Sequence, residues 1–193
     1  MNVLSTLSII IAFFCSALGL IVIARKKIRE YSLFFFLASQ VALIWILANV
    51  GLTLFEERDL ALLSARLSFS SGVFIATFLL LFSLSFPKIK QNTIPIRYLI
   101  FLPTIFFAVL SWTKLITIEI DRTSDGINNI AYGPVYILYT VYLVILILLT
   151  IFVLYRKQKV LVNQEKLQIR YFLAGILISS FFVALQLAGA QTL

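Results

Sequence analysis

Six long apolar segments, separated by polar connections, make up almost the whole chain. Each segment has about the 17–25 residues that an α-helix needs to cross the roughly 30 Å hydrocarbon core of a bilayer. The pattern predicts an all-α, polytopic membrane bundle of six transmembrane helices, in a single domain that covers residues 1–193. We place the segments at about Val3–Ala24, Tyr31–Phe55, Leu60–Phe86, Ile96–Trp112, Pro134–Tyr155 and Leu167–Ala188.

The connection after the fourth segment is the longest, and part of it has the two-residue period of a β-strand. Apolar and polar residues alternate over Ile116–Ile120, turn-forming residues follow at Asp121–Gly126, and Ile127–Ile130 can return as a second strand. We predict a small extracellular β-hairpin between the fourth and fifth helices, with an irregular loop as the alternative. An isolated two-stranded hairpin is marginal in water, so this one needs support from the bundle.

Composition agrees with lipid as the solvent of this chain. Apolar residues make up 62% of the 193 residues and charged residues 12%, and the mean hydropathy is +1.06. Cys15 is the single cysteine, so no intrachain disulfide can form. The chain has no histidine, which removes the usual imidazole base and the commonest transition-metal ligand. We expect no cofactor and no metal site.

The net charge of +8 is distributed in a way that argues against nucleic acid as a partner. Basic residues gather on alternate connections, which is the positive-inside pattern of membrane proteins, and it places the N-terminus outside. Twelve of the 16 basic residues follow the first, third and fifth segments: Arg25, Lys26, Lys27, Arg29, Lys88, Lys90, Arg97, Arg156, Lys157, Lys159, Lys166 and Arg170. The second and fourth connections hold six acids: Glu56, Glu57, Asp59, Glu119, Asp121 and Asp125.

No arrangement typical of an enzyme is present. The chain lacks a phosphate-binding loop of the form G-x-x-x-x-G-K-[ST], an H-E-x-x-H pair, a C-x-x-C pair and a G-x-S-x-G elbow. No carboxylate or lysine occupies the centre of a predicted span, which disfavours a proton-coupled pump and a retinal protein. We therefore expect that this chain is not an enzyme.

Polar residues within the predicted spans are informative because a bilayer interior penalises them. Arg66 lies six residues into the third segment, and the remaining candidates fall at a similar depth, in the outer third of the bilayer. The candidate ligand-binding residues are Asn49, Arg66, Tyr136, Tyr139 and Gln186.

Two interpretations of these residues stay open. In the first, they line an outward-facing aromatic cleft in which Arg66 favours an anionic or strongly hydrogen-bonding ligand. In the second, Arg66 extends to the outer surface, the tyrosines belong to the interfacial belt, and the amides of Asn49 and Gln186 join helices.

A stripe of small residues runs along the third segment. Ser64, Ser68, Gly72 and Ala76 recur every four residues, a spacing that lets another helix approach closely. Packing within the bundle is the default interpretation, and homodimerisation is the alternative.

Several segments resemble the N-terminal seven-helix membrane region of bacterial sensor histidine kinases. The similarity is carried by Ala131–Tyr136 (AYGPVY), Tyr155–Lys157 (YRK), Glu165–Tyr171 (EKLQIRY), Leu173–Ser179 (LAGILIS), Ala65–Leu67 (ARL) and Leu84–Pro87 (LSFP). It covers roughly residues 60–180, and none of these motifs is a catalytic signature.

The resemblance implies a sensory or ligand-recognition domain of a two-component system in the bacterial cytoplasmic membrane. Its partners would be the bilayer and a small-molecule or membrane-derived stimulus. The family pattern has a seventh helix and then a signalling module, whereas this chain ends after the sixth segment, so we expect a fragment, a truncated product or a stand-alone derivative. A small transporter and a structural protein that acts through helix contacts are the alternative functions.

Overall fold

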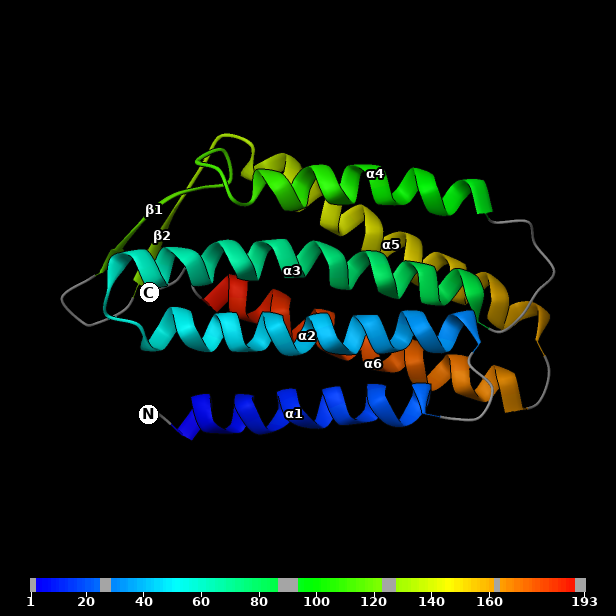
Figure 1. Ribbon diagram of the computed structural model, residues 1–193. Helices are drawn as coiled ribbons and strands as arrows, with labels where there is room; N and C mark the ends of the chain where they lie inside the picture. The colour runs from blue at the N-terminus through cyan, green and yellow to red at the C-terminus, as the bar shows by residue number, and fades with distance from the viewer. Residues whose placement is uncertain (1–2, 25–28, 87–93, 123–127, 162–163, 190–193) are drawn as a thin grey trace. The chain divides into compact units, whose positions relative to one another are not determined.

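The computed structural model describes residues 3–24, 29–86, 94–122, 128–161 and 164–189 (Figure 1). This part of the chain is mostly helical and contains one two-stranded antiparallel sheet. The elements in order are α1 (Val3–Ile23), α2 (Glu30–Leu54), α3 (Arg58–Ser85), α4 (Ile94–Leu110), β1 (Thr117–Arg122), β2 (Asn128–Tyr132), α5 (Tyr136–Val160) and α6 (Gln164–Gly189). The predicted helical architecture is thereby confirmed.

Four helices in the described part are long and apolar enough to cross a membrane: α1, α2, α3 and α5. Helix α4 contains a shorter apolar stretch, Leu99–Leu110. The chain is therefore a membrane protein, while membrane crossings by α4 and α6 stay predictions.

Tight internal contacts divide the chain into two compact units, Met1–Leu146 and Ile147–Leu193. The boundary falls within α5, so the first unit contains α1 to α4, the sheet and the beginning of α5. The second unit contains the rest of α5 and α6.

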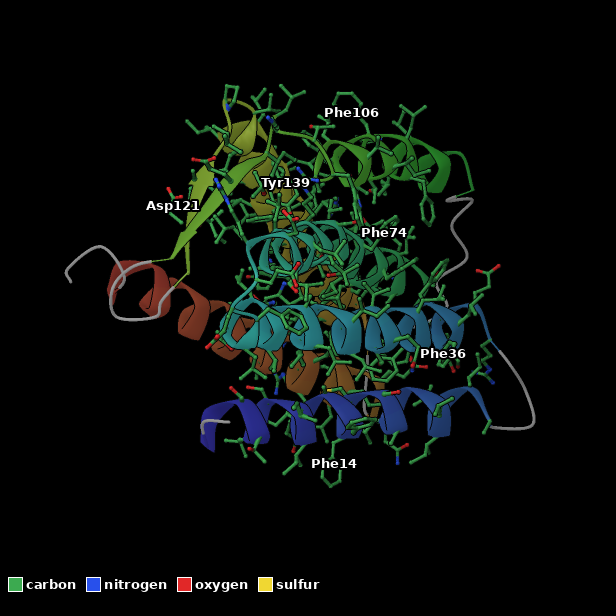
Figure 2. The ribbon with its side chains drawn as sticks, turned by 60° about the vertical axis from the view of Figure 1, so that its left-hand side comes forward. Phe14, Phe36, Phe74, Phe106, Asp121 and Tyr139 are labelled. Atoms are coloured by element: carbon green, nitrogen blue, oxygen red, sulfur yellow. The ribbon has the colours of Figure 1, made fainter. Side chains whose placement is uncertain are left out.

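Helix α1 packs on α2 through small and polar residues. Ser16 donates a hydrogen bond from its hydroxyl to Gln40 Oε1 at 2.9 Å, and Gln40 Nε2 donates to the Ser16 carbonyl at 3.3 Å. A Cβ atom at Gly19 would lie 2.8 Å from Ser39 Cβ, so the two helices approach too closely there for a larger residue. Phe14, by contrast, projects away from α2 and is 68% exposed, as lipid-facing residues are (Figure 2).

The small-residue stripe of α3 faces α2, as the default interpretation expects. A Cβ atom at Gly51 of α2 would lie 2.8 Å from Ser64 Oγ. One at Gly72 would lie 3.3 Å from the Tyr139 hydroxyl of α5 and 3.8 Å from Trp45 Nε1 of α2. The stripe therefore lets α2 and α3 pack closely within one chain.

Bulky residues join the C-terminal half of α3 to its neighbours. Phe78 and Leu81 form a core cluster with Ala38 of α2, and Phe101 of α4 packs against it. The Phe78 and Phe101 rings meet edge to face, with centroids 6.1 Å apart.

The expected pair of strands is present as a two-stranded antiparallel sheet, with strands that begin and end slightly later than expected. We call β1 and β2 the hairpin, and its extracellular position stays a prediction. Thr117 pairs with Tyr132 and Ile120 with Ile130, and the register shifts between Thr117 and Glu119. The hairpin has the support that its marginal stability requires, because Ile120 packs on Ala61 and Ala65 of α3.

The chain leaves the hairpin through a glycine that no other residue can replace easily. Gly133 donates a backbone hydrogen bond to the Ile116 carbonyl, and Val135 donates one to the Leu115 carbonyl. A Cβ atom at Gly133 would lie 2.3 Å from the Leu115 carbonyl oxygen, so a side chain would break this contact. The close approach fixes the start of α5 against the segment that enters β1.

Candidate functional site

Four aromatic rings gather where the hairpin, α3 and α5 meet. We call Phe69, Tyr132, Tyr136 and Tyr139 the aromatic cluster. The Phe69 ring of α3 lies 6.3 Å from Tyr132, 5.9 Å from Tyr136 and 5.7 Å from Tyr139, each in edge-to-face geometry. Tyr132 and Tyr136 stack with their centroids 4.0 Å apart. One phenylalanine thus contacts both the hairpin and α5, and such pairs each contribute about 0.5–1.5 kcal/mol beyond area burial.

Tyr139 fixes α5 to the backbone of α3. Its side chain is only 2% exposed, and its hydroxyl donates a 2.7 Å hydrogen bond to the Phe69 carbonyl. Figure 2 shows Tyr139 among the side chains between the hairpin and the helices. The bond satisfies a hydroxyl that would otherwise be buried without a partner.

Tyr132 gives the cluster a polar group at the hairpin. Burial, and next the neighbouring Tyr136, raise the pKa of Tyr132 above its ordinary value of 10.0. The hydroxyl therefore stays protonated at physiological pH and remains able to donate a hydrogen bond.

Arg66 lies one turn from Phe69 along α3, on the same side of the helix. Its Nε atom is buried and donates no hydrogen bond to any residue that the structure describes. The side chain as a whole is partly exposed. Arg66 is thus a cation without a counter-ion in the described protein.

Asn49 lies apart from Arg66. Its Nδ2 atom donates to Ser68 Oγ at 2.9 Å and to the Trp45 carbonyl at 2.7 Å. Ser68 and Arg66 are two residues apart on α3, which separates them by about 160° around the helix axis at 3.6 residues per turn. Asn49 therefore makes the helix-to-helix hydrogen bond of the second sequence interpretation.

The five candidate residues consequently separate into groups. Tyr136 and Tyr139 belong to the aromatic cluster, and Arg66 lies one helical turn from Phe69 of that cluster. Asn49 lies in the contact between α2 and α3, where it bonds to Ser68. The side chain of Gln186 lies outside the described residues. The sequence analysis does not single out Phe69. Its spacing of three residues from Arg66 places both on one face of a helix and could have pointed to it.

A second polar group lies deeper, between α3, α4 and α5. We call Thr77, Thr104 and Tyr142 the hydroxyl cluster. Thr104 Oγ1 lies 2.8 Å from Thr77 Oγ1 and 2.9 Å from the Tyr142 hydroxyl. Each hydroxyl can also donate to a backbone carbonyl, Thr77 to Val73 and both others to Ile100.

The proton count makes the hydroxyl cluster adaptable. Three hydroxyl protons serve five short contacts, so the cluster can be ordered in more than one direction. Because each member has a backbone acceptor in reach, a small movement of one helix need not leave a buried hydroxyl unpaired.

In the second unit, the end of α5 is basic and partly sheltered by aromatic rings. The Arg156 guanidinium lies 5.7 Å from the Phe152 ring centroid, and Lys159 Nζ lies 4.7 Å from that of Tyr155. Cations at a helix C-terminus also interact favourably with the helix dipole. Phe152 and Tyr155 therefore hold the cations of the basic end beside apolar surface.

Among the described residues, no group of three or more His, Cys, Asp or Glu side chains could hold a metal ion. The aromatic cluster and the neighbouring Arg66 present aromatic rings, hydroxyls and a guanidinium.

Comparison with known proteins points to one family. A family model described as the N-terminal 7TM region of histidine kinase matches residues 7–193, which is almost the entire chain. No curated protein matches the chain.

Proposed function

The chain belongs to the family that forms the N-terminal 7TM region of histidine kinases, and from this premise we propose that it is a membrane-embedded sensory domain. Its stimulus would act from the outer side, and its response would be a change in the arrangement of its helices. A stimulus can shift such an equilibrium only if it binds the two arrangements with different affinity.

The observation that carries the proposal is the position of Phe69. Its ring contacts Tyr132 of the hairpin and Tyr139 of α5, while its backbone belongs to α3. A ligand or membrane property that displaces the hairpin would therefore act on two transmembrane helices at once. This is what a sensor that passes a signal along its helices requires.

The surrounding assignments are part of the proposal. We infer a multi-pass protein of the bacterial cytoplasmic membrane, with its N-terminus and hairpin outside and its basic connections inside. Its partners are the bilayer and a small-molecule or membrane-derived stimulus, with homodimerisation as a further possibility and no role for nucleic acid. The chain has no histidine to accept a phosphate, so we infer that it senses and does not catalyse.

Distances between spin labels on α3 and α5 test the sensory function. In a Cys15→Ser background, labels at Leu63 and Leu138, both lipid-exposed, report the separation of the two helices. We expect two distance populations in nanodiscs, with a ratio that changes with acyl-chain length or with added small molecules. A single population that no condition shifts would contradict the proposal.

Two phenylalanines provide a matched comparison for this experiment. Phe69→Ala removes the ring that joins the hairpin to α5, so we expect the shift in populations to disappear. Phe106→Ala removes a ring that is 57% exposed and points outward (Figure 2), so the shift should persist.

The alternative functions make different predictions. A transporter has a water-filled path, so single cysteines placed along α3 and α5 would react with aqueous maleimide in a continuous stripe. A purely structural protein would yield a stable crosslinked partner and distances between labels that no condition changes.

A further inference from the structure

Two buried polar atoms in the described part of the chain lack a hydrogen-bond partner: Arg66 Nε and Thr117 Oγ1. Thr117 is fully buried and begins β1, opposite Tyr132. Arg66 lies about 12 Å along α3 from Arg58, at 1.5 Å per residue. Because β1 packs on the first turns of α3, both atoms belong to the end of the molecule where the hairpin docks.

A guanidinium in this position needs a counter-ion. Arg66 lies within a candidate membrane span, where charged side chains are costly unless they are paired or reach water. Because the Arg66 Nε atom is buried, an acceptor that pairs with the guanidinium would relieve this cost.

The acidic residues of the hairpin lie beside a different arginine. The hairpin carboxylates, Glu119 and Asp121, lie beside Arg58, at 2.5 Å and 4.0 Å from its Nη2 atom. Asn49 donates from its Nδ2 atom to Ser68, which lies on the far side of α3 from Arg66. Arg66 has no ion pair with a described residue.

We propose that a carboxylate or phosphate oxyanion from outside the protein binds Arg66 at the hairpin end of α3, with the Thr117 hydroxyl as a second donor. The guanidinium N–H groups and the hydroxyl can all donate, and an oxyanion accepts from several donors at once. This inference rests on the proposed sensory function and deepens it by naming the class of stimulus. A lipid phosphate and a soluble carboxylate share this chemistry.

NMR of the full chain in dodecyl maltoside, which carries no oxyanion, tests the site. The Arg66 Nε–H resonance is identified as the one missing from Arg66→Lys, and the chain is titrated with sodium octanoate, inorganic phosphate or phosphatidylcholine. We expect at least one of them to shift this resonance saturably, while neutral octanol does not. A response to phosphatidylcholine alone identifies a headgroup site, and a response to octanoate or phosphate identifies a soluble ligand. No response to any oxyanion would overturn the proposal.

For variants of the two donors, binding is followed by the chemical shift of the backbone amide at position 117. Arg66→Lys keeps the charge but loses Nε and the planar fork, so binding should weaken about tenfold. Thr117→Val should weaken it about threefold or more, and unchanged binding would remove Thr117 from the site. Arg58→Lys alters an exposed, ion-paired cation and should leave binding unchanged.

The failure of this inference can be told apart from the failure of the sensory function. If no oxyanion binds but the α3–α5 distances still respond to bilayer thickness, the sensor stands and the ligand class is wrong. If an oxyanion binds but the distances never change, the site stands and the sensory function is wrong.

Discussion

At the scale of single residues, Tyr139 combines an apolar task with a polar one. Its ring packs against Phe69 and Phe107, and its hydroxyl donates a hydrogen bond to the Phe69 carbonyl. Interhelical hydrogen bonds of this kind contribute only modestly to stability, because the same polar groups also find hydrogen-bond partners in the unfolded state within the membrane.

We therefore expect Tyr139→Phe to lower the free energy of unfolding by about 0.5–1.5 kcal/mol, since it removes the bond and keeps the ring. Unfolding in mixed micelles of increasing SDS content measures the change. Tyr171→Phe is the control, because that side chain is 71% exposed, and it should change stability little. Equal effects in the two variants would show that the Phe69 bond contributes nothing.

The candidate site was only partly predictable from the sequence, for a geometric reason. The distance of a residue from the end of its helix gives its depth, and this placed Asn49, Arg66 and Tyr139 near one level. Which way each residue faces depends on which neighbour packs where, and this information is tertiary. Asn49 and Arg66 accordingly share a predicted depth, but Asn49 contacts the side of α3 that carries Ser68, and Arg66 lies on the opposite side.

At the scale of elements, the α1–α2 contact depends on a glycine. Gly19→Ala would place a methyl group 2.8 Å from Ser39 Cβ, which is shorter than atoms tolerate. We expect a loss of about 1–3 kcal/mol in stability, as for overpacked cores, or a displacement of α1. The same unfolding measurement tests this expectation.

Gly175→Ala is the matched control for Gly19→Ala. A Cβ atom there meets nothing within 4 Å, and alanine is the better helix former by up to about 1 kcal/mol. Gly175→Ala should therefore be neutral or stabilising. Equal losses at the two glycines would contradict close α1–α2 packing.

The hairpin should depend on apolar docking more than on its ion pair. Ile120 is 2% exposed and packs on α3, whereas the Arg58–Glu119 pair is exposed and worth little. We expect Ile120→Ser to release the hairpin, with a local loss of about 2–4 kcal/mol. Hydrogen exchange of the β1 and β2 amides measures this loss as reduced protection.

Ile118→Ser is the control for Ile120→Ser, because Ile118 lies on the same strand and is 40% exposed. Its replacement should leave hairpin protection nearly unchanged. If both variants lose the same protection, strand propensity and not docking on α3 holds the hairpin.

The hydroxyl cluster should behave as one unit. Thr77 and Tyr142 both contact the Thr104 hydroxyl, so the loss of one changes which hydrogen bonds Thr104 can make with the other. We expect Thr77→Val and Tyr142→Phe to be non-additive by about 0.5–1 kcal/mol in a double-mutant cycle. Thr140→Val, an exposed hydroxyl that bonds within its own helix, should add to Thr77→Val within about 0.5 kcal/mol.

At the scale of the whole molecule, hydropathy predicted a membrane protein with six crossings, and four of the described helices are long and apolar enough to cross. Helix length and apolar content are local properties, so α1, α2, α3 and α5 follow directly from the sequence. The described apolar stretch Leu99–Leu110 is only about 18 Å long at 1.5 Å per residue, less than the roughly 30 Å of a bilayer core. Whether α4 crosses the membrane therefore depends on how its ends and its neighbouring helices contact the lipid. The hydrophobic pattern of the sequence does not contain this information.

The orientation of the chain in the membrane can be determined without knowing the number of crossings, because one labelled position on each side of the membrane is enough. In a Cys15→Ser background, Asp121→Cys places a thiol on the exposed hairpin, and Lys159→Cys places one at the basic end of α5. We expect a membrane-impermeant maleimide to label the first in intact cells and the second only after permeabilisation, because basic residues are retained on the cytoplasmic side. The unsubstituted Cys15→Ser chain should stay unlabelled throughout. The reverse order would place Arg66 in the inner leaflet, where a cytoplasmic anion, and not an external one, would have to neutralise it.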